Sequence, residues 1–139
     1  MFWCFHCYAL NDYPSGPCSA CGEPVEAPAG LSYIDGLIWA LRHPDGDRAL
    51  VAAQTLGRLR AHEAIPALRE AVEAGSDIYI RGEALRSLIA IEGVESLRLW
   101  LDALSRDAPF NVRGIAREAL DGQLSADYPA VCKHAEPKR

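Results

Sequence analysis

Four of the five cysteines stand in two identical pairs near the N-terminus, Cys4 with Cys7 and Cys18 with Cys21, and ten residues separate the pairs. A C-x2-C pair forms a tight turn whose backbone N–H groups point at the thiolates, and two such turns together offer four sulfurs in a tetrahedron. This donor set predicts a structural Zn²⁺ site. The alternatives are a rubredoxin-like iron site, two disulfides or free thiols.

The spacing over residues 4–22, C-x2-C, ten residues, C-x2-C-G, resembles that of short zinc ribbons. That family implies a structural metal, and four sulfurs leave no coordination position open for water or substrate. Gly22 suits a turn that needs positive φ, and Tyr8 occupies the matching place in the first pair. His6 is expected to be a bystander, because the sulfurs already fill the coordination sphere.

We therefore expect a zinc ribbon over residues 1–24 and a semi-extended linker over 25–30, which contains proline and glycine. The ribbon is rich in aromatic side chains for its size. They are expected to form a small core or a seam against the rest of the chain, with an exposed contact patch as the alternative: Phe2, Trp3, Phe5 and Tyr8.

Beyond the linker, small and branched apolar residues recur every 32 positions, in the series Ala52, Ala84, Ala116 and the series Leu56, Leu88, Leu120. Self-similarity at this period indicates a solenoid of stacked helix pairs. Apolar residues at i, i+3, i+4 and i+7 predict helices over about 31–42, 47–60, from near Pro66, 78–91, 94–105 and from near Val112. The inward set of the second helix is expected to be Val51, Ala52, Leu56 and Leu59.

Residues 49–72 contain A-x-x-x-L-G-x-L, a turn and A-I-P-A-L, and this pattern resembles the HEAT repeat in its short bacterial form, also found in phycobilisome-lyase-like proteins. The resemblance covers about 31–122, and Arg81 and Arg113 occupy the arginine position of that family. It implies a mainly α fold: a short right-handed α-solenoid of HEAT-like helix pairs behind the zinc ribbon. Residues 123–139 are then a C-terminal tail or cap.

In that family the second helix of each pair lines the concave face. Counting five residues on from the equivalent positions Ile34, Ile65 and Val94 predicts a solvent-facing row of Trp39, Glu70 and Leu99. Candidates beside this row are Tyr33, Asp35, Arg42 and Glu73. Tryptophan is a favoured interface anchor, so Trp39 is the main candidate for partner binding. The alternative is that Trp39 packs beneath the ribbon.

Charge bears on the kind of partner. The chain has 19 acidic and 14 basic residues and a net charge of −5. The first thirty residues contain three acidic residues and no lysine or arginine, and a Zn²⁺ bound by four thiolates adds −2. Non-specific nucleic-acid binding depends on neutralising phosphates with basic residues, so this balance argues against it.

The sequence has no apolar run long enough to cross a bilayer, and its start lacks the features of a signal peptide, so we expect a cytoplasmic protein without membrane contact. The histidines are scattered and there is no glycine-rich phosphate loop, so we expect no enzyme. A protein–protein interaction or scaffold module is favoured. The alternatives are a nucleic-acid-binding module and a lyase-like accessory. The open ends of a short solenoid need covering, which suggests the ribbon at the first end and the tail or a second copy, in a homodimer, at the last.

Overall fold

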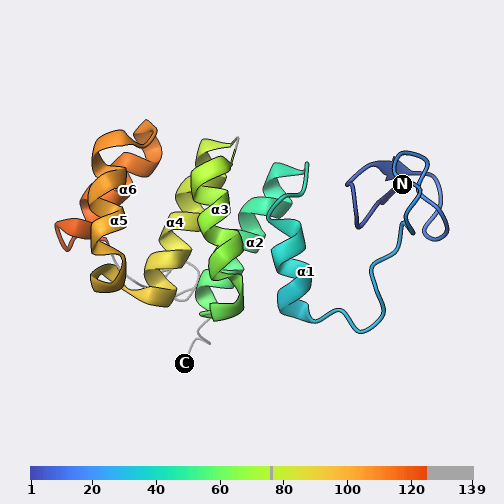
Figure 1. Ribbon diagram of the computed structural model, residues 1–139, viewed down its shortest axis with the longest axis horizontal. Helices are drawn as coiled ribbons and strands as arrows, with labels where there is room; N and C mark the ends of the chain where they lie inside the picture. The colour runs from blue at the N-terminus through green and yellow to red at the C-terminus, as the bar shows by residue number, and fades with distance from the viewer. Residues whose placement is uncertain (76, 125–139) are drawn as a thin grey trace, which may run out of the picture.

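The computed structural model describes residues 1–75 and 77–124. Over these residues a small region with two short strands is followed by six α-helices and one 3-10 turn (Figure 1). The fold is therefore mainly α, as predicted. The predicted tail or cap lies outside the described residues from residue 125 onward, and no described helix combines the length and hydropathy needed to cross a membrane.

The helices begin and end within about two residues of the bounds that the apolar periodicity predicts. They are α1 (Tyr33–Ala40), α2 (Gly46–Arg58), η1 (His62–Ala64), α3 (Ile65–Ala74), α4 (Ile78–Glu92), α5 (Val94–Asp107) and α6 (Phe110–Leu120). Side-chain oxygens of Ser32, Asp45 and Asp77 accept backbone N–H groups at the starts of α1, α2 and α4. Pro66 occupies the first turn of α3, where its missing N–H is not needed.

Successive helix pairs pack side by side along the long axis of the molecule (Figure 1). Helix α2 packs on α4 and α4 packs on α6, while α1, α3 and α5 pack on α2, α4 and α6 respectively. Ala52 in α2, Ala84 in α4 and Ala116 in α6 are all buried in one core cluster. The 32-residue period is thus the period of the shared core.

The predicted inward set of α2 is wrong in two positions. Val51 is 55% exposed and Leu59 is 49% exposed, whereas Ala49 and Ala53 are fully buried together with Leu56. With 3.6 residues per turn, the stripe that faces the core follows the spacing of the three buried residues, and Val51 lies on its flank. Leu59 is the residue that follows the last turn of α2.

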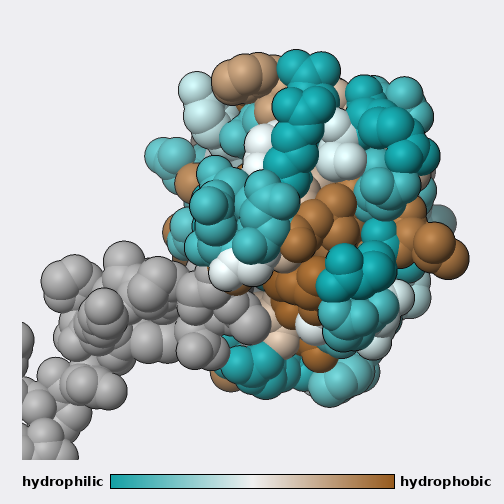
Figure 2. All heavy atoms as spheres, turned by 90° about the vertical axis from the view of Figure 1, so that its left-hand side faces the viewer, coloured by the Kyte–Doolittle hydropathy of each residue, from teal (hydrophilic) through white to brown (hydrophobic). Residues whose placement is uncertain are grey.

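The end of the array formed by α5 and α6 has an apolar patch framed by hydrophilic residues (Figure 2). These two helices carry the exposed Leu99 and Phe110 and the half-buried Leu104 and Leu120. Leu120 ends a series whose earlier members, Leu56 and Leu88, are fully buried. Among the described residues no further helix pair follows α6, so the last member is less covered.

Arg81, at the arginine position of the repeat, closes the C-terminal end of the neighbouring helix α3. Its Nε donates to the Val72 carbonyl at 2.7 Å, and its Nη atoms donate to the carbonyls of Gly75 and Glu73 at 3.3 and 3.4 Å. The last carbonyls of a helix have no intrahelical partner, so a guanidinium that serves three of them ties two helix pairs together.

Replacing Arg81 with methionine keeps most of the aliphatic stem and removes all three hydrogen bonds. Because the site is only half-buried, we expect the free energy of unfolding to fall by about 1–2 kcal/mol. Urea denaturation followed by circular dichroism measures this change. Arg58→Met is the control, because Arg58 is exposed and donates to Thr55 Oγ1 within its own helix at 3.4 Å. Equal losses in the two variants would contradict the capping role.

Candidate metal centre and the surfaces around it

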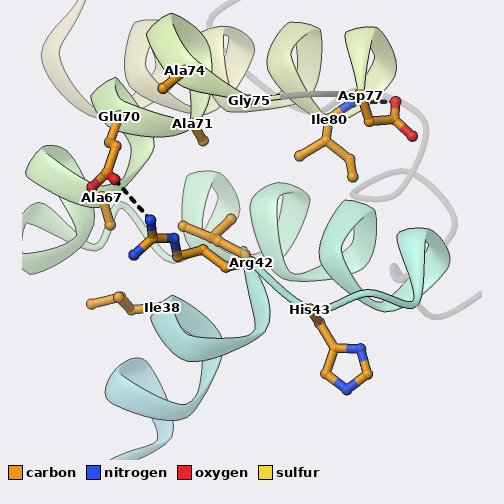
Figure 3. Close-up of a pocket in the computed structure, with 11 residues that line it drawn as sticks. Ile38, Arg42, His43, Ala67, Glu70, Ala71, Ala74, Gly75, Asp77 and Ile80 are labelled. Carbon is orange, nitrogen blue, oxygen red and sulfur yellow. Dashed lines mark hydrogen bonds and ion pairs between the residues drawn. The ribbon is translucent and has the colours of Figure 1, made fainter. Parts of the chain in front are cut away.

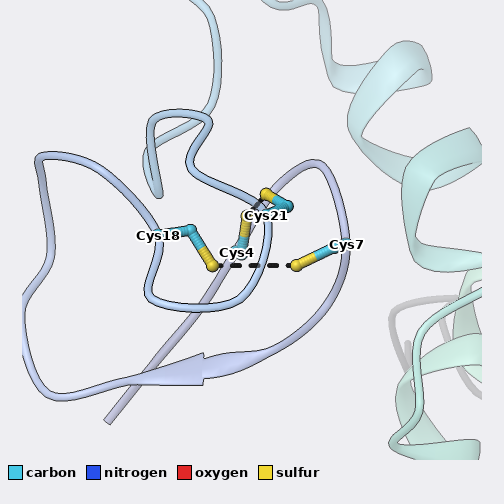
Figure 4. A group of neighbouring side chains, drawn as sticks. All are labelled: Cys4, Cys7, Cys18 and Cys21. Carbon is cyan, nitrogen blue, oxygen red and sulfur yellow. Dashed lines mark hydrogen bonds between the residues drawn. The ribbon is translucent and has the colours of Figure 1, made fainter.

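The ribbon is built from two equivalent cysteine turns. Strands β1 (Phe2–Trp3) and β2 (Leu10–Asn11) pair antiparallel and carry the first turn between them. At its base the Cys4 N–H donates to the Ala9 carbonyl at 2.8 Å. In the second turn the Cys18 N–H donates to the Glu23 carbonyl at 2.7 Å. The same backbone closure in both turns presents two pairs of sulfurs to each other (Figure 4).

Each turn ends on a residue in the left-handed region. Gly22 has φ 82° and Tyr8 has φ 63°, and their N–H groups donate to the Cys18 and Cys4 carbonyls, both at 2.9 Å. Glycine adopts this conformation freely, whereas a residue with a Cβ pays about 1 kcal/mol or more. The backbone of Tyr8 is therefore strained, and a glycine at this position would avoid the strain.

The four sulfurs have the geometry of one metal site. Their Sγ atoms all lie within 4.8 Å of one another, and the pairs Cys4–Cys21 and Cys7–Cys18 are each 3.7 Å apart. A tetrahedron with Zn–S bonds of about 2.3 Å has edges of about 3.8 Å. A disulfide would need about 2.05 Å, and all four cysteines are free. The four cysteines together fit a metal site that is consistent with zinc.

The surroundings favour a thiolate at Cys18 but not at Cys7. The backbone N–H groups of Cys21 and Ala20 and the amide of Asn11 lower the pKa of the Cys18 thiol to about 6. At Cys7 a backbone N–H lowers the pKa, but desolvation and the other three thiols raise it to about 12. Four thiols at one point therefore ionise together only when a cation compensates their charge, and acid should weaken metal binding.

Asn11 is a supporting residue that sequence reasoning missed. It is buried, its Nδ2 donates to Cys18 Sγ at 3.4 Å, and its Oδ1 accepts the N–H and hydroxyl of Ser19 at 3.0 and 3.1 Å. It thus holds the second cysteine turn in place as well as donating to a ligand sulfur. No spacing rule distinguishes it from the neighbouring turn residues.

The ribbon extends slightly beyond the predicted boundary at residue 24. Val25 is buried with Cys4 and Cys18, its carbonyl accepts the Phe5 N–H at 2.9 Å, and its N–H donates to the Gly16 carbonyl at 2.9 Å. The extended connection to α1 therefore starts after this residue. Its sequence is nonetheless that of the predicted linker, and no described helix or strand falls between residues 26 and 32.

Trp39 packs beneath the ribbon, which is the alternative that the sequence left open for it. The Phe5 and Tyr8 rings stack on Trp39, with centroids 5.4 and 5.1 Å away and interplanar angles of 9° and 19°. The Tyr8 hydroxyl donates to the Trp39 carbonyl at 2.7 Å, and Trp39 Nε1 donates to the Phe5 carbonyl. The ribbon thereby covers the first end of the helical array, and Trp39 is not an open anchor.

His43 completes this aromatic seam, and it was also missed. The imidazole is buried and meets the Trp3 and Trp39 rings edge-on, with centroids 4.6 and 5.2 Å away. Burial, followed by the charge of Arg48, lowers the pKa of His43. Its Nδ1 accepts the Asp45 N–H at 3.0 Å, so the ring packs as a neutral imidazole. Phe2, in contrast, is 43% exposed and stands outside the seam.

A groove of about 420 Å³ lies between α1, α3 and the start of α4 (Figure 3). The predicted residues Arg42 and Glu70 meet across it in an ion pair of 3.1 Å, although both side chains stay more than half exposed. Most of the other lining residues are apolar: Ile38, Leu41, Ala67, Ala71, Ala74 and Ile80. His43 also lines the groove, but its imidazole ring points away from it (Figure 3).

The other candidates for partner binding do not line this groove. Glu73 is exposed on α3, one turn beyond Glu70. Tyr33 and Leu99 are 69% and 89% exposed, at the start of α1 and in α5. Asp35 is exposed in the first turn of α1, where its backbone N–H donates to Ser32 Oγ. Of the predicted partner-binding residues, Arg42 and Glu70 are the two that line this groove.

The fold and the site define a helical-repeat protein with an N-terminal four-cysteine cluster that fits a metal ion. A family model described as HEAT repeats matches residues 34–121, more than half of the chain. The chain belongs to the HEAT-repeat family, as the pattern of residues 49–72 predicts. No curated protein and no solved structure gave a match.

Proposed function

We propose that this protein is a non-catalytic interaction module that binds a segment of a partner protein in the groove between α1 and α3. The observation that carries the proposal is the groove itself. It has an apolar wall and, across its mouth, the exposed ion pair of Arg42 and Glu70. An apolar centre with a polar rim is the usual composition of a protein-binding surface, and HEAT repeats typically serve as such scaffolds.

The charges around the groove favour a protein over a nucleic acid. Arg42 is the one arginine among the lining residues, and Glu70 pairs with it, while Asp77 adds a second negative charge. Phosphate backbones require several arginine or lysine contacts. The metal is proposed to be zinc with a structural role, since its four sulfur ligands complete a tetrahedron.

The test compares two variants with the same change in charge. Glu70→Arg with Ala74→Arg alters the groove, and Glu95→Arg with Leu99→Arg makes the equivalent change on α5, where Glu95 also pairs with an arginine. Proteins captured from extracts of the native host are quantified by mass spectrometry. We expect the groove variant to lose the specific partner by about tenfold or more and the α5 variant to retain it.

Two outcomes would contradict the proposal. In the first, the groove variant captures the same proteins as the wild type at the same level. In the second, the chain binds nucleic acid with an affinity that falls steeply as salt is raised, which is the mark of phosphate contacts. Circular dichroism melts of both variants show that each is folded before binding is compared.

A further inference from the structure

The ribbon and α1 are joined by contacts that serve both sides at once. The Trp39 indole N–H, the Trp39 carbonyl near the C-terminal end of α1, and the Tyr8 hydroxyl all find partners across the seam. Aromatic stacking of Phe5 and Tyr8 on the same indole adds buried apolar area. Neither the ring nor these polar groups would be covered if the two parts separated.

On the ribbon side, the residue that links the ribbon to Trp39 is Tyr8, which belongs to the first cysteine turn. Tyr8 directly follows the ligand Cys7, and its backbone closes the first cysteine turn at φ 63°. The equivalent position in the second turn is Gly22, which carries no side chain. A small module of about thirty residues cannot bury enough apolar surface to hold this turn alone, so the metal must hold it. The strained residue is thus the one that reaches the helices.

On the helical side, α1 is a weak element. It has eight residues, and isolated helices shorter than about 12 residues are marginal in water. It packs against α2 and η1, and Ala40 is its one buried residue. Its last turn also supplies Ile38, and the residues just after it supply Arg42, to the wall of the groove.

We propose that metal occupancy of the four-cysteine site is coupled, through Tyr8 and Trp39, to the order of α1. With the metal bound, the first cysteine turn holds Tyr8 and Phe5 on Trp39, and α1 stays packed. Without it, the turn opens, the seam is lost and α1 frays. The coupling stands on these contacts alone. Its consequence, that metal loss removes one wall of the partner groove, rests on the proposed function.

Coupling between two sites is reciprocal, so a change in α1 must alter metal affinity. Trp39→Ala removes none of the four cysteines, yet we expect its Zn²⁺ affinity to be about tenfold weaker than that of the wild type. Competition of the full-length protein with a chromogenic chelator for Zn²⁺ measures this. Leu99→Ala is the control, because Leu99 is 89% exposed in α5 and should leave the affinity unchanged. An unchanged affinity in Trp39→Ala would overturn the proposal.

The converse test follows backbone hydrogen exchange in the chain alone, with Zn²⁺ and after chelation. We expect the amides of residues 33–43 to exchange about tenfold faster without metal. Amides of α4 and α6 should not change. Equal exchange of residues 33–43 in both states would overturn the coupling. No partner is present, so failure of the groove to bind a protein leaves this result unaffected.

A third variant separates the bridge from metal binding itself. Tyr8→Gly suits the backbone of the cysteine turn, since glycine favours positive φ, and removes the side chain that contacts Trp39. With Zn²⁺ bound, we expect this variant to exchange at residues 33–43 faster than zinc-loaded wild type. Exchange equal to zinc-loaded wild type would show that Tyr8 is not the bridge.

Discussion

Replacing Cys18 with serine is expected to weaken Zn²⁺ binding more than a hundredfold and to destabilise the ribbon while the helical array stays folded. Structural zinc sites contribute about 10–16 kcal/mol in total, so losing one of four thiolates should remove about 3 kcal/mol, more than a hundredfold in affinity. Cys18 is buried and its Sγ accepts hydrogen bonds from Asn11 and Ala20, and serine would place a neutral hydroxyl where the thiolate is expected.

The measurement is the metal content of the purified chain by mass spectrometry, together with chelator competition for Zn²⁺. Cys132→Ser is the matched control, because Cys132 has no place in either C-x2-C pair and lies outside the described residues. We expect one zinc per chain in the wild type and in the control. A Zn²⁺ affinity in Cys18→Ser equal to that of the wild type would contradict the four-sulfur site, and iron in place of zinc would favour the rubredoxin-like alternative.

Replacing Leu88 with alanine is expected to give the largest loss of stability in the helical array, about 3–4 kcal/mol. Leu88 is fully buried in α4, and this helix packs against α2, α3, α5 and α6. Truncation there removes buried apolar surface and leaves a cavity that several helices line. Because a domain of this size has only about 5–10 kcal/mol of stability, such a loss moves the unfolding midpoint strongly.

Urea denaturation followed by the far-ultraviolet circular dichroism of the helices measures this loss. Leu99→Ala serves as control, since the side chain is 89% exposed and its truncation should change stability by less than about 0.5 kcal/mol. Similar losses at the two positions would contradict the assignment of Leu88 to the shared core. A ribbon that unfolds separately would appear as a change in tryptophan fluorescence at lower urea.

The parts of this protein that local sequence determines were predicted well. Two C-x2-C pairs are sufficient to predict the four-sulfur cluster, because each short turn fixes the direction of its own thiolates. The helices were predicted with similar accuracy, since an apolar stripe at helical spacing and capping residues such as Asp45 and Asp77 act within one or two turns. Periodicity was less reliable on the edges of a helix, where Val51 proved exposed.

The surfaces between these elements were decided by tertiary structure. Trp39 contacts a residue 34 positions earlier in the chain, and no periodic pattern encodes whether a ribbon will dock on that face. The same holds for His43, which the turn after α1 delivers to the seam, and for the groove that Arg42 and Glu70 span. Sequence alone determined the four-sulfur cluster and the helices, because those depend on neighbours in the chain. Only the packed structure determined which side chains remain free for a partner, because exposure depends on every element that docks nearby.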